Sequence, residues 1–342
     1  LQAKMETIHY RTEFKPLEGK VLLPRFAIHD GQITRDLSYS GDILRNIDWS
    51  QIDLNSFNVT VGSLDSMEDR TERVGLTQDH GIVRSHLTGS KAAPLHLDRG
   101  FLVQQIADVL PNPWIAWDVV TQALEKLHDI SDDQIARESM FIVERLRAVV
   151  KRERDRLAAD LFVQMLADQQ IQFFIQSVHA YSLPITLQSR FGTKRMVRDD
   201  NTSIQRSLFE YQSTDNFNDT ESSVAIYLDK QANLLFWYRN LVGEGNFSIQ
   251  GWEDRRIWPD FVATKRIDDT TDYNQLYVLE TKGMHLAGNA DTQYKKDVFA
   301  LCNNEGTKIN WSMLGAEFVN KKIEFKIVYE NEWHRTIHPY LE

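Results

Sequence analysis

Two acidic residues and a lysine in the last third of the sequence combine types and spacing that could do chemistry. Asp260 lies in the segment WPDFV (258–262), and Glu280 and Lys282 lie in VLETKG (278–283). Each segment is apolar enough to belong to a strand, where side chains alternate between the two faces. Glu280 and Lys282 are therefore expected to share one face, close to the carboxylate of Asp260 if the two strands pair.

A pair of carboxylates beside a lysine suits reactions of phosphate esters. Carboxylate oxygens are ligands for Mg²⁺, which keeps several waters and binds phosphate oxygens. The metal, with Mn²⁺ as a substitute, lowers the pKa of a bound water and neutralises charge on the phosphate. Lys282 would orient the water or stabilise developing negative charge. The alternative is that Asp260 is a turn acid and that Glu280 and Lys282 form a surface pair on a strand.

The elements that must position these residues follow from the patterning of residues 207–342. The first predicted element is a helix that Asp219 or Thr220 caps and that runs through Leu228. The others are strands at 234–239, 247–250, 257–264 and 276–281, a helix at 291–301 and a strand at 323–329. The polar turn at 268–272 would join two of these strands as an antiparallel pair. Such a pair brings Asp260 and Glu280 together.

The preceding sequence divides into two regions. Residues 1–98 contain apolar runs between turn residues and predict a β-rich N-terminal region. Residues 99–206 predict a helical coupling region, in which 133–180 form one or two long helices because Gly and Pro are almost absent. With 207–342 as the third domain, the predicted fold class is α/β (α+β overall).

Composition limits the function classes. The chain has 342 residues, with 42% hydrophobic and 26% charged, which predicts two or three folded domains and excludes overall disorder. No apolar stretch is long enough to span a membrane, so we expect a cytoplasmic location. The single cysteine, Cys302, excludes an intrachain disulfide and a cysteine-based zinc site. The net charge of −10 argues against a protein that coats nucleic acid, but it allows an enzyme with local basic surfaces.

The motif Pro259-Asp260 … Glu280-Thr281-Lys282 and the order of the predicted elements resemble the PD-(D/E)xK nuclease superfamily. The resemblance implies a restriction-endonuclease-like αβββαβ core with a mixed sheet. It also implies Mg²⁺-dependent hydrolysis of phosphodiester bonds in DNA. In that chemistry Asp260 and Glu280 hold the metal and Lys282 assists.

A narrower resemblance covers about residues 219–300. The segments FWYRN (236–240), WPDF (258–261) and LETKG (279–283) are similar to the C-terminal endonuclease domain of type III restriction enzyme Res subunits and related DEAD/DEAH-type helicase–nucleases. This resemblance implies restriction–modification and defence against foreign DNA. It further implies an ATP-driven motor N-terminal to the nuclease and a separate modification (methyltransferase) subunit.

The motor itself is not expected in this sequence. It contains no Gly-x-x-x-x-Gly-Lys-Ser/Thr loop, so ATP is expected only on motor domains outside it. Because the sequence begins at Leu1 rather than at Met, we expect the C-terminal part of a longer polypeptide. The expected partners are DNA, the motor domains of that polypeptide and the modification subunit, and no membrane.

The superfamily resemblance also implies additional site residues on the two helices. An acid at the start of the first helix often completes the metal site, and Glu221 is the candidate, with Asp219 as a rival. The alternative for Glu221 is a favourable first-turn charge on the helix dipole. On the second helix Lys295 is the candidate catalytic residue, and Lys296 could contact DNA or lie on a solvated face.

Further candidates for DNA contacts precede this core or lie within it. They are Arg239, Asn240, Lys296, Arg195 and Arg198. Arg239 could reach phosphate but could equally pair with an acid. The leading hypothesis is a Mg²⁺-dependent DNA endonuclease. The alternatives are a catalytically inactive nuclease-fold module that binds DNA or couples domains, and a repair or RNA-directed nuclease with the same core.

Overall fold

The computed structural model describes residues 4–29, 33–59, 72–76, 82–86, 98–268, 270–283, 288–330 and 332–341. The chain forms two compact units, which we call the sheet unit (Leu1–Ser38 with Leu166–Glu342) and the helical unit (Tyr39–Met165). These divisions differ from the predicted boundaries at 98 and 206. The reason is long-range strand pairing, which joins the first 38 residues to the C-terminal part of the chain.

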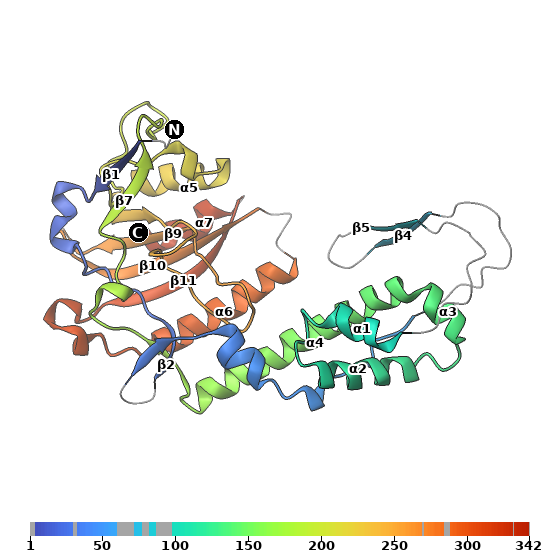
Figure 1. Ribbon diagram of the computed structural model, residues 1–342. Coiled ribbons are helices and arrows are strands. Elements are labelled where there is room, and N and C mark those ends of the chain that lie inside the picture. Colours follow the sequence, from blue (N-terminus) through green and yellow to red (C-terminus); the bar gives the residue numbers. More distant parts are fainter. Residues whose placement is uncertain are drawn as a thin grey trace. The chain divides into compact units, whose positions relative to one another are not determined.

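The sheet unit mixes helices and strands, as the predicted α/β class requires (Figure 1). Its strands are β1 (Met5–His9), β2 (Arg25–His29), β3 (Thr34–Asp36), β6 (Ile171–Phe174), β7 (Thr186–Arg190), β8 (Leu234–Arg239), β9 (Phe261–Arg266), β10 (Tyr273–Lys282) and β11 (Lys322–Tyr329). Its helices are α5 (Asp219–Lys230), α6 (Ala290–Gly306) and α7 (Trp333–Leu341).

A mixed four-stranded sheet is central to this unit, in the order β11-β10-β9-β8. Strands β10 and β11 are parallel, and β9 is antiparallel to both of its neighbours. Along the chain the order is α5, three strands, α6 and β11, which is one strand fewer before α6 than the residue pattern predicts. Leu279 pairs with Phe261, so Asp260 and Glu280 lie next to each other at one end of this pair.

Two predicted strands differ from the structure. Residues 247–250 are not a strand, since Ile249 makes only an isolated bridge to Ile257. The strand predicted at 257–264 begins at Phe261 instead. The segment before Phe261 is held by the bridge between Ile249 and Ile257 and by hydrogen bonds to the side chain of Asn240. These contacts take the place of regular strand pairing.

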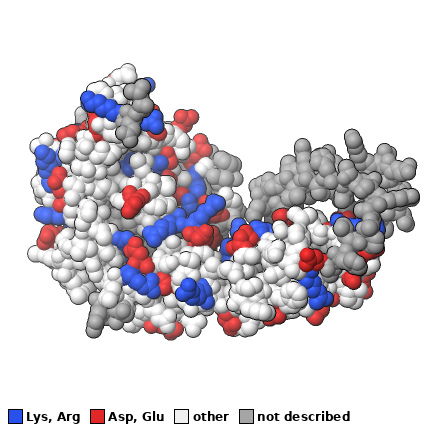
Figure 2. Space-filling model, viewed as in Figure 1, with Lys and Arg blue, Asp and Glu red and all other residues white. Residues whose placement is uncertain are grey.

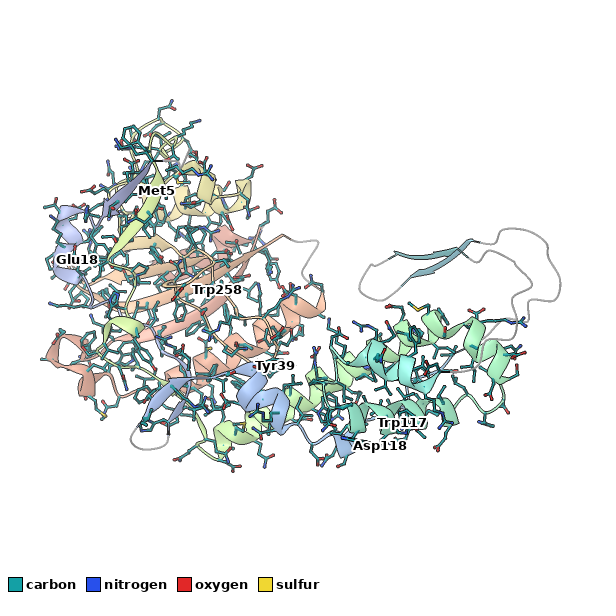
Figure 3. The ribbon with its side chains drawn as sticks, viewed as in Figure 1. Met5, Glu18, Tyr39, Trp117, Asp118 and Trp258 are labelled. Carbon is teal, nitrogen blue, oxygen red and sulfur yellow. The ribbon has the colours of Figure 1, made fainter. Side chains whose placement is uncertain are left out.

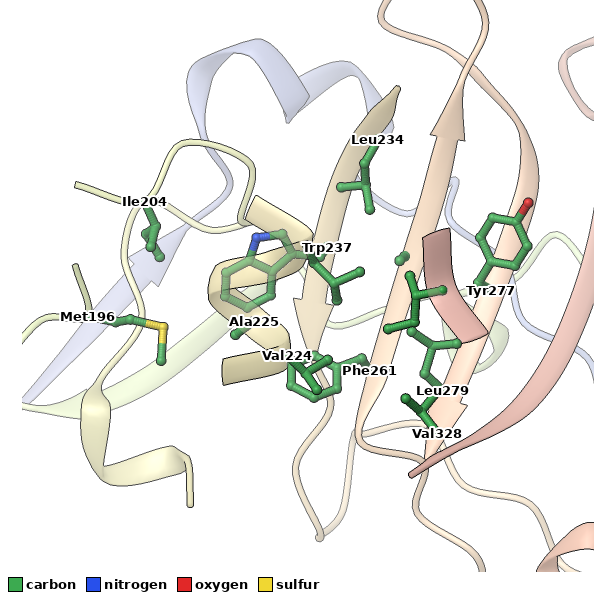
Figure 4. Packing of buried hydrophobic residues seen from close by; sticks show 13 residues of the cluster. Met196, Ile204, Val224, Ala225, Leu234, Trp237, Phe261, Tyr277, Leu279 and Val328 are labelled. Atoms are coloured by element: carbon green, nitrogen blue, oxygen red, sulfur yellow. The ribbon is translucent and has the colours of Figure 1, made fainter. Parts of the chain in front are cut away.

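Capping and burial explain the first helix and the strand that follows it. The cap of α5 is Asn218, not Asp219 or Thr220 as predicted, and Glu221 completes a capping box with it. All six residues of β8 are buried although β8 is the edge strand of this sheet, and an isolated bridge from Ser207 to Trp237 pairs with it on the outer side. Val224 and Leu228 of α5 pack in one hydrophobic cluster with apolar residues of the sheet (Figure 4). Each such fully buried large side chain contributes about 1.5–3 kcal/mol to stability.

The long helix ends earlier than predicted. Helix α4 (Ser139–Ala167) stops where Gln169 adopts a positive φ of 59°, a conformation that ends helices. The chain then enters β6, which pairs with β2 and alternates between buried and partly buried residues. The predicted helical segment 168–180 is therefore wrong, because pairing with a distant strand overrides local propensity.

The helical unit contains α1 (Arg99–Ile106), α2 (Pro113–Glu125), α3 (Asp132–Arg137) and most of α4, with the hairpin of β4 (Glu72–Leu76) and β5 (Ile82–His86). The predicted cap at Ser131 is confirmed as a capping box with Gln134. Trp117 and its neighbour Asp118 lie on the solvent-exposed side of α2 (Figure 3). Among the described residues, no helix is both long and apolar enough to cross a membrane.

Candidate active site

Residues from four elements converge at one end of the four-stranded sheet. Glu221 comes from the first turn of α5, Asp260 directly precedes β9, and Glu280 and Lys282 are on β10. Lys295 reaches the same place from α6. We call the three acids Glu221, Asp260 and Glu280 the carboxylate cluster. The sequence-predicted trio and both additional candidates are therefore neighbours in the structure.

Asp260 is fixed by contacts on both of its carboxylate oxygens. The main-chain N–H and the hydroxyl of Thr281 both donate to Oδ2, at 2.7 and 2.6 Å. Nη1 of Arg239 donates to Oδ1 at 2.9 Å. Trp258, labelled in Figure 3, belongs to the segment that leads into Asp260 and is partly buried. The Thr281 contact was not predicted, because it depends on the offset between two strands rather than on residue spacing.

Glu280 is almost completely buried, with 4% of its surface exposed. Its Oε1 accepts a hydrogen bond from Lys295 at 2.7 Å and forms an ion pair with Lys282 at 3.3 Å. Its Oε2 has no hydrogen-bond partner. Burial raises the pKa of Glu280 to about 7, assisted by the negative charge of Asp260 and opposed by Lys295 and Lys282.

Glu221 caps its helix and also reaches the carboxylate cluster. Its Oε2 accepts the main-chain N–H of Asn218 at 2.9 Å, which completes the helix cap. Its Oε1 pairs with Arg239 at 2.6 Å within the cluster. Burial raises the pKa of Glu221 despite these contacts, and the charge of Asp260 adds to that effect. The rival acid Asp219 is exposed, and its main-chain oxygen accepts a hydrogen bond from Ser223.

The two lysines share a further acid, Asp291, at the start of α6. Asp291 contacts Lys282 at 3.1 Å and Lys295 at 3.7 Å, while Asn289 caps α6. Burial favours a lower pKa for Lys282, but Glu280 and Asp291 outweigh it and raise the pKa above the usual lysine value. Lys282 is therefore protonated at neutral pH and can donate hydrogen bonds.

Two of the predicted DNA-contact residues are internal. Arg239 is buried in the carboxylate cluster. The Asn240 amide donates to the main-chain oxygens of Phe247 and Pro259, at 2.9 and 2.8 Å, and its oxygen accepts the N–H of Phe247. Asn240 thus holds the chain segment before Asp260 in place.

Each of the other three candidates has a different partner. Arg198 pairs with the buried Asp229 at 2.6 Å. Arg195 stacks over the ring of Tyr211, and Lys296 lies 5.4 Å from the ring centre of Tyr329. Figure 2 shows basic and acidic side chains interleaved on the visible face of the sheet unit. Each of these three predicted DNA-contact side chains therefore has a partner of its own within the protein.

The donor chemistry of the cluster fits a hard divalent cation such as Mg²⁺. The cluster offers three carboxylates, and one buried oxygen, Oε2 of Glu280, has no partner. Within the part of the chain that the structure describes, no three His, Cys, Asp or Glu side chains are placed to surround a metal ion as they stand. Arg239 and the two lysines are the cations that neutralise these acids instead.

Comparison with known proteins adds no relative. No protein-family model matches the chain, and neither a curated protein nor a solved structure is significantly similar to it. The functional interpretation therefore depends on the geometry of the site and on the motifs of the sequence.

Proposed function

We propose that the protein is a Mg²⁺-dependent DNA endonuclease that hydrolyses phosphodiester bonds. One observation carries the proposal. Three carboxylates and two lysines converge at the end of a mixed sheet, and one carboxylate oxygen in this cluster, Oε2 of Glu280, is buried and has no partner. A buried acid with an unsatisfied oxygen is costly for folding, so its presence indicates a ligand that completes it.

The carboxylate cluster supplies the ligands in this proposal. Asp260 and Glu280 would hold Mg²⁺, or Mn²⁺ in its place, with Glu221 as a further ligand. When bound, the metal supplies an activated water and neutralises charge on the phosphate. Lys295 donates to Oε1 of Glu280 and thereby fixes the orientation of the carboxylate that presents Oε2.

Lys282 acts as a donor rather than as a base. Its raised pKa keeps the amine protonated at neutral pH, so it can orient a water or contact a phosphate oxygen. Asp291, at 3.1 Å, holds the amine on the face of β10 that carries Glu280. The proton therefore stays on Lys282 while negative charge develops on the phosphate.

The biological setting of the proposal follows from the type III resemblance over about residues 219–300. It comprises cytoplasmic restriction of foreign DNA, an ATP-driven motor and a methyltransferase subunit that reads the DNA sequence. In this setting the isolated chain needs no sequence preference of its own. Cleavage of any plasmid is then an adequate assay.

The direct test is cleavage of plasmid DNA by the purified chain with Mg²⁺ and with EDTA. We expect nicking or linearisation with Mg²⁺ only, and loss of that activity in Asp260→Asn. The matched control is Asp219→Asn, an exposed acid on the same helix turn as Glu221. Equal cleavage by wild type and Asp260→Asn would refute the assignment. Parallel assays on single-stranded DNA and RNA decide between a DNA endonuclease and the repair or RNA-directed alternative.

One observation favours the inactive-module alternative. Arg239, Lys282 and Lys295 already neutralise the carboxylate cluster without a metal. A protein of this kind would bind DNA in a mobility-shift assay without cutting it under any divalent cation. The plasmid assay and the mobility-shift assay together separate the two functions.

A further inference from the structure

Arg239 holds two members of the carboxylate cluster at once. Its Nη2 pairs with Oε1 of Glu221 at 2.6 Å, and its Nη1 contacts Oδ1 of Asp260 at 2.9 Å. Nη1 also donates to the main-chain oxygens of Asp260 and Asn240, and Nε donates to that of Asn216 at 3.2 Å. Each nitrogen of the guanidinium group therefore has an acceptor inside the protein.

The surroundings keep this guanidinium charged and in place. Arg239 is buried, and the ring centres of Phe217 and Phe261 lie 5.7 and 5.3 Å from its central carbon. An arginine stays protonated at all pH values at which proteins are folded, and its planar fork matches carboxylates better than an ammonium group does. Arg239 is thus a permanent positive charge between Glu221 and Asp260.

Charge compensation in the cluster is uneven as a result. Arg239 neutralises Glu221 and Asp260, whereas the lysines contact Glu280 only through Oε1. Oε2 of Glu280 has no partner. A divalent cation that binds Oε2 and Asp260 must approach Arg239 and compete with it for Oδ1 of Asp260. Repulsion between like charges is strong at such distances in a partly buried site.

We propose that Arg239 is a positioning residue that holds Glu221 and Asp260 when no metal is bound. It then competes with the divalent cation for these two carboxylates. This inference rests on the proposed function, because it assigns a cation to the same cluster. It predicts two opposite effects of removing the arginine. The metal-free protein loses stability, since two acids are left uncompensated, and the affinity for the metal increases.

The test measures Mn²⁺ binding by isothermal titration calorimetry and thermal unfolding in EDTA on the full chain. Arg239→Met should lower the metal-free unfolding temperature and tighten Mn²⁺ binding by about tenfold or more, given the size of the Coulomb term removed. Arg239→Lys keeps a positive charge but loses the planar fork of the guanidinium group. It should therefore fold more readily than Arg239→Met and should tighten Mn²⁺ binding less. The control is Arg255→Met, an exposed arginine, which should change neither quantity.

Unchanged or weaker Mn²⁺ binding in the folded Arg239 variants would overturn the inference and leave Arg239 a purely structural residue. The two proposals fail separately. Tighter binding in the variants without nucleic-acid cleavage by the wild type refutes the nuclease and supports the role of Arg239. Cleavage by the wild type with unaltered Mn²⁺ affinity in both variants refutes the role of Arg239 alone.

Discussion

Two buried carboxylates of the sheet unit, Asp229 and Glu280, have opposite surroundings. Asp229 is fully buried and accepts hydrogen bonds from Arg198, from the main-chain N–H groups of Gln205 and Arg206, and from the indole of Trp237. Both of its oxygens are satisfied. Glu280 is nearly as buried, yet one of its oxygens has no partner.

The difference separates a folding role from a ligand role. The contacts of Asp229 join the segment before α5 to the end of that helix and to β8, so its charge stabilises tertiary structure. Glu280 makes no stabilising hydrogen bond through Oε2, and burial raises the pKa of Glu280 to about 7. Under the proposed function, a saturated buried acid such as Asp229 serves the fold, and an unsaturated one in a cluster of acids, such as Glu280, serves a binding site.

The largest effect is expected on cleavage at Glu280. Glu280→Gln removes a metal ligand while keeping the shape of the side chain, so the rate of Mg²⁺-dependent DNA cleavage should fall by about a thousandfold, on the order of 4 kcal/mol in the barrier. The measurement is the initial rate of plasmid nicking. Asp297→Asn, an exposed acid on α6, serves as the control. Undiminished nicking by Glu280→Gln would place Glu280 in the same class as Asp229.

Asp229→Asn should affect stability instead. The substitution leaves Arg198 without its ionised partner in a buried network, which costs about 3–5 kcal/mol of the free energy of unfolding. Urea unfolding monitored by tryptophan fluorescence measures it. At a temperature where the variant is folded, its cleavage rate per folded molecule should match that of wild type. A stable but inactive Asp229→Asn would reverse the comparison.

Glu280 should also make the stability of the folded protein depend on pH. Because the folded-state pKa of Glu280 is about 7 and the ordinary value is 4.5, the folded protein binds more protons than the unfolded chain between these limits. The contribution of Glu280 to the free energy of unfolding is therefore fully present below pH 4.5 and is lost as the pH rises through 7. In EDTA, the stability of wild type relative to Glu280→Gln should decrease from pH 5 to pH 8. A difference that is constant over this range would contradict the raised pKa.

The smallest effect concerns the adjacent lysines of α6. Lys295 contacts Glu280, whereas Lys296 lies near the ring of Tyr329. Lys295→Met should lower the cleavage rate by about tenfold, since a hydrogen bond to a charged group contributes about 1.5 kcal/mol or more, and Lys296→Met should change it about twofold or less. Equal effects of the two substitutions would mean that helix charge, rather than contact with Glu280, matters for activity.

Local patterns in the sequence predicted the parts of the fold that depend on neighbouring residues. Strand β8 coincides with the predicted 234–239, and α6, β10 and β11 differ from their predictions only at the ends. The proximity of Asp260 and Glu280 followed from the hairpin between their strands. Such features are set by side-chain periodicity and turn residues, which a single sequence contains.

Features that depend on distant segments could not be predicted in this way. The pairing of β1 with β7 and of β2 with β6 joins residues more than a hundred positions apart. The reach of Arg239 to both Glu221 and Asp260 depends on how α5 packs against the sheet. These contacts are fixed by tertiary packing, and the sequence offered for Arg239 only the alternatives of a phosphate or an acid.

Anomalous diffraction from crystals soaked in Mn²⁺ tests the central claim most directly. The proposed function predicts an anomalous peak within bonding distance of Asp260 and of Oε2 of Glu280, with the guanidinium of Arg239 displaced from Oδ1 of Asp260. A soaked crystal with no peak at the carboxylate cluster, and with Arg239 still joined to Glu221 and Asp260, would contradict it.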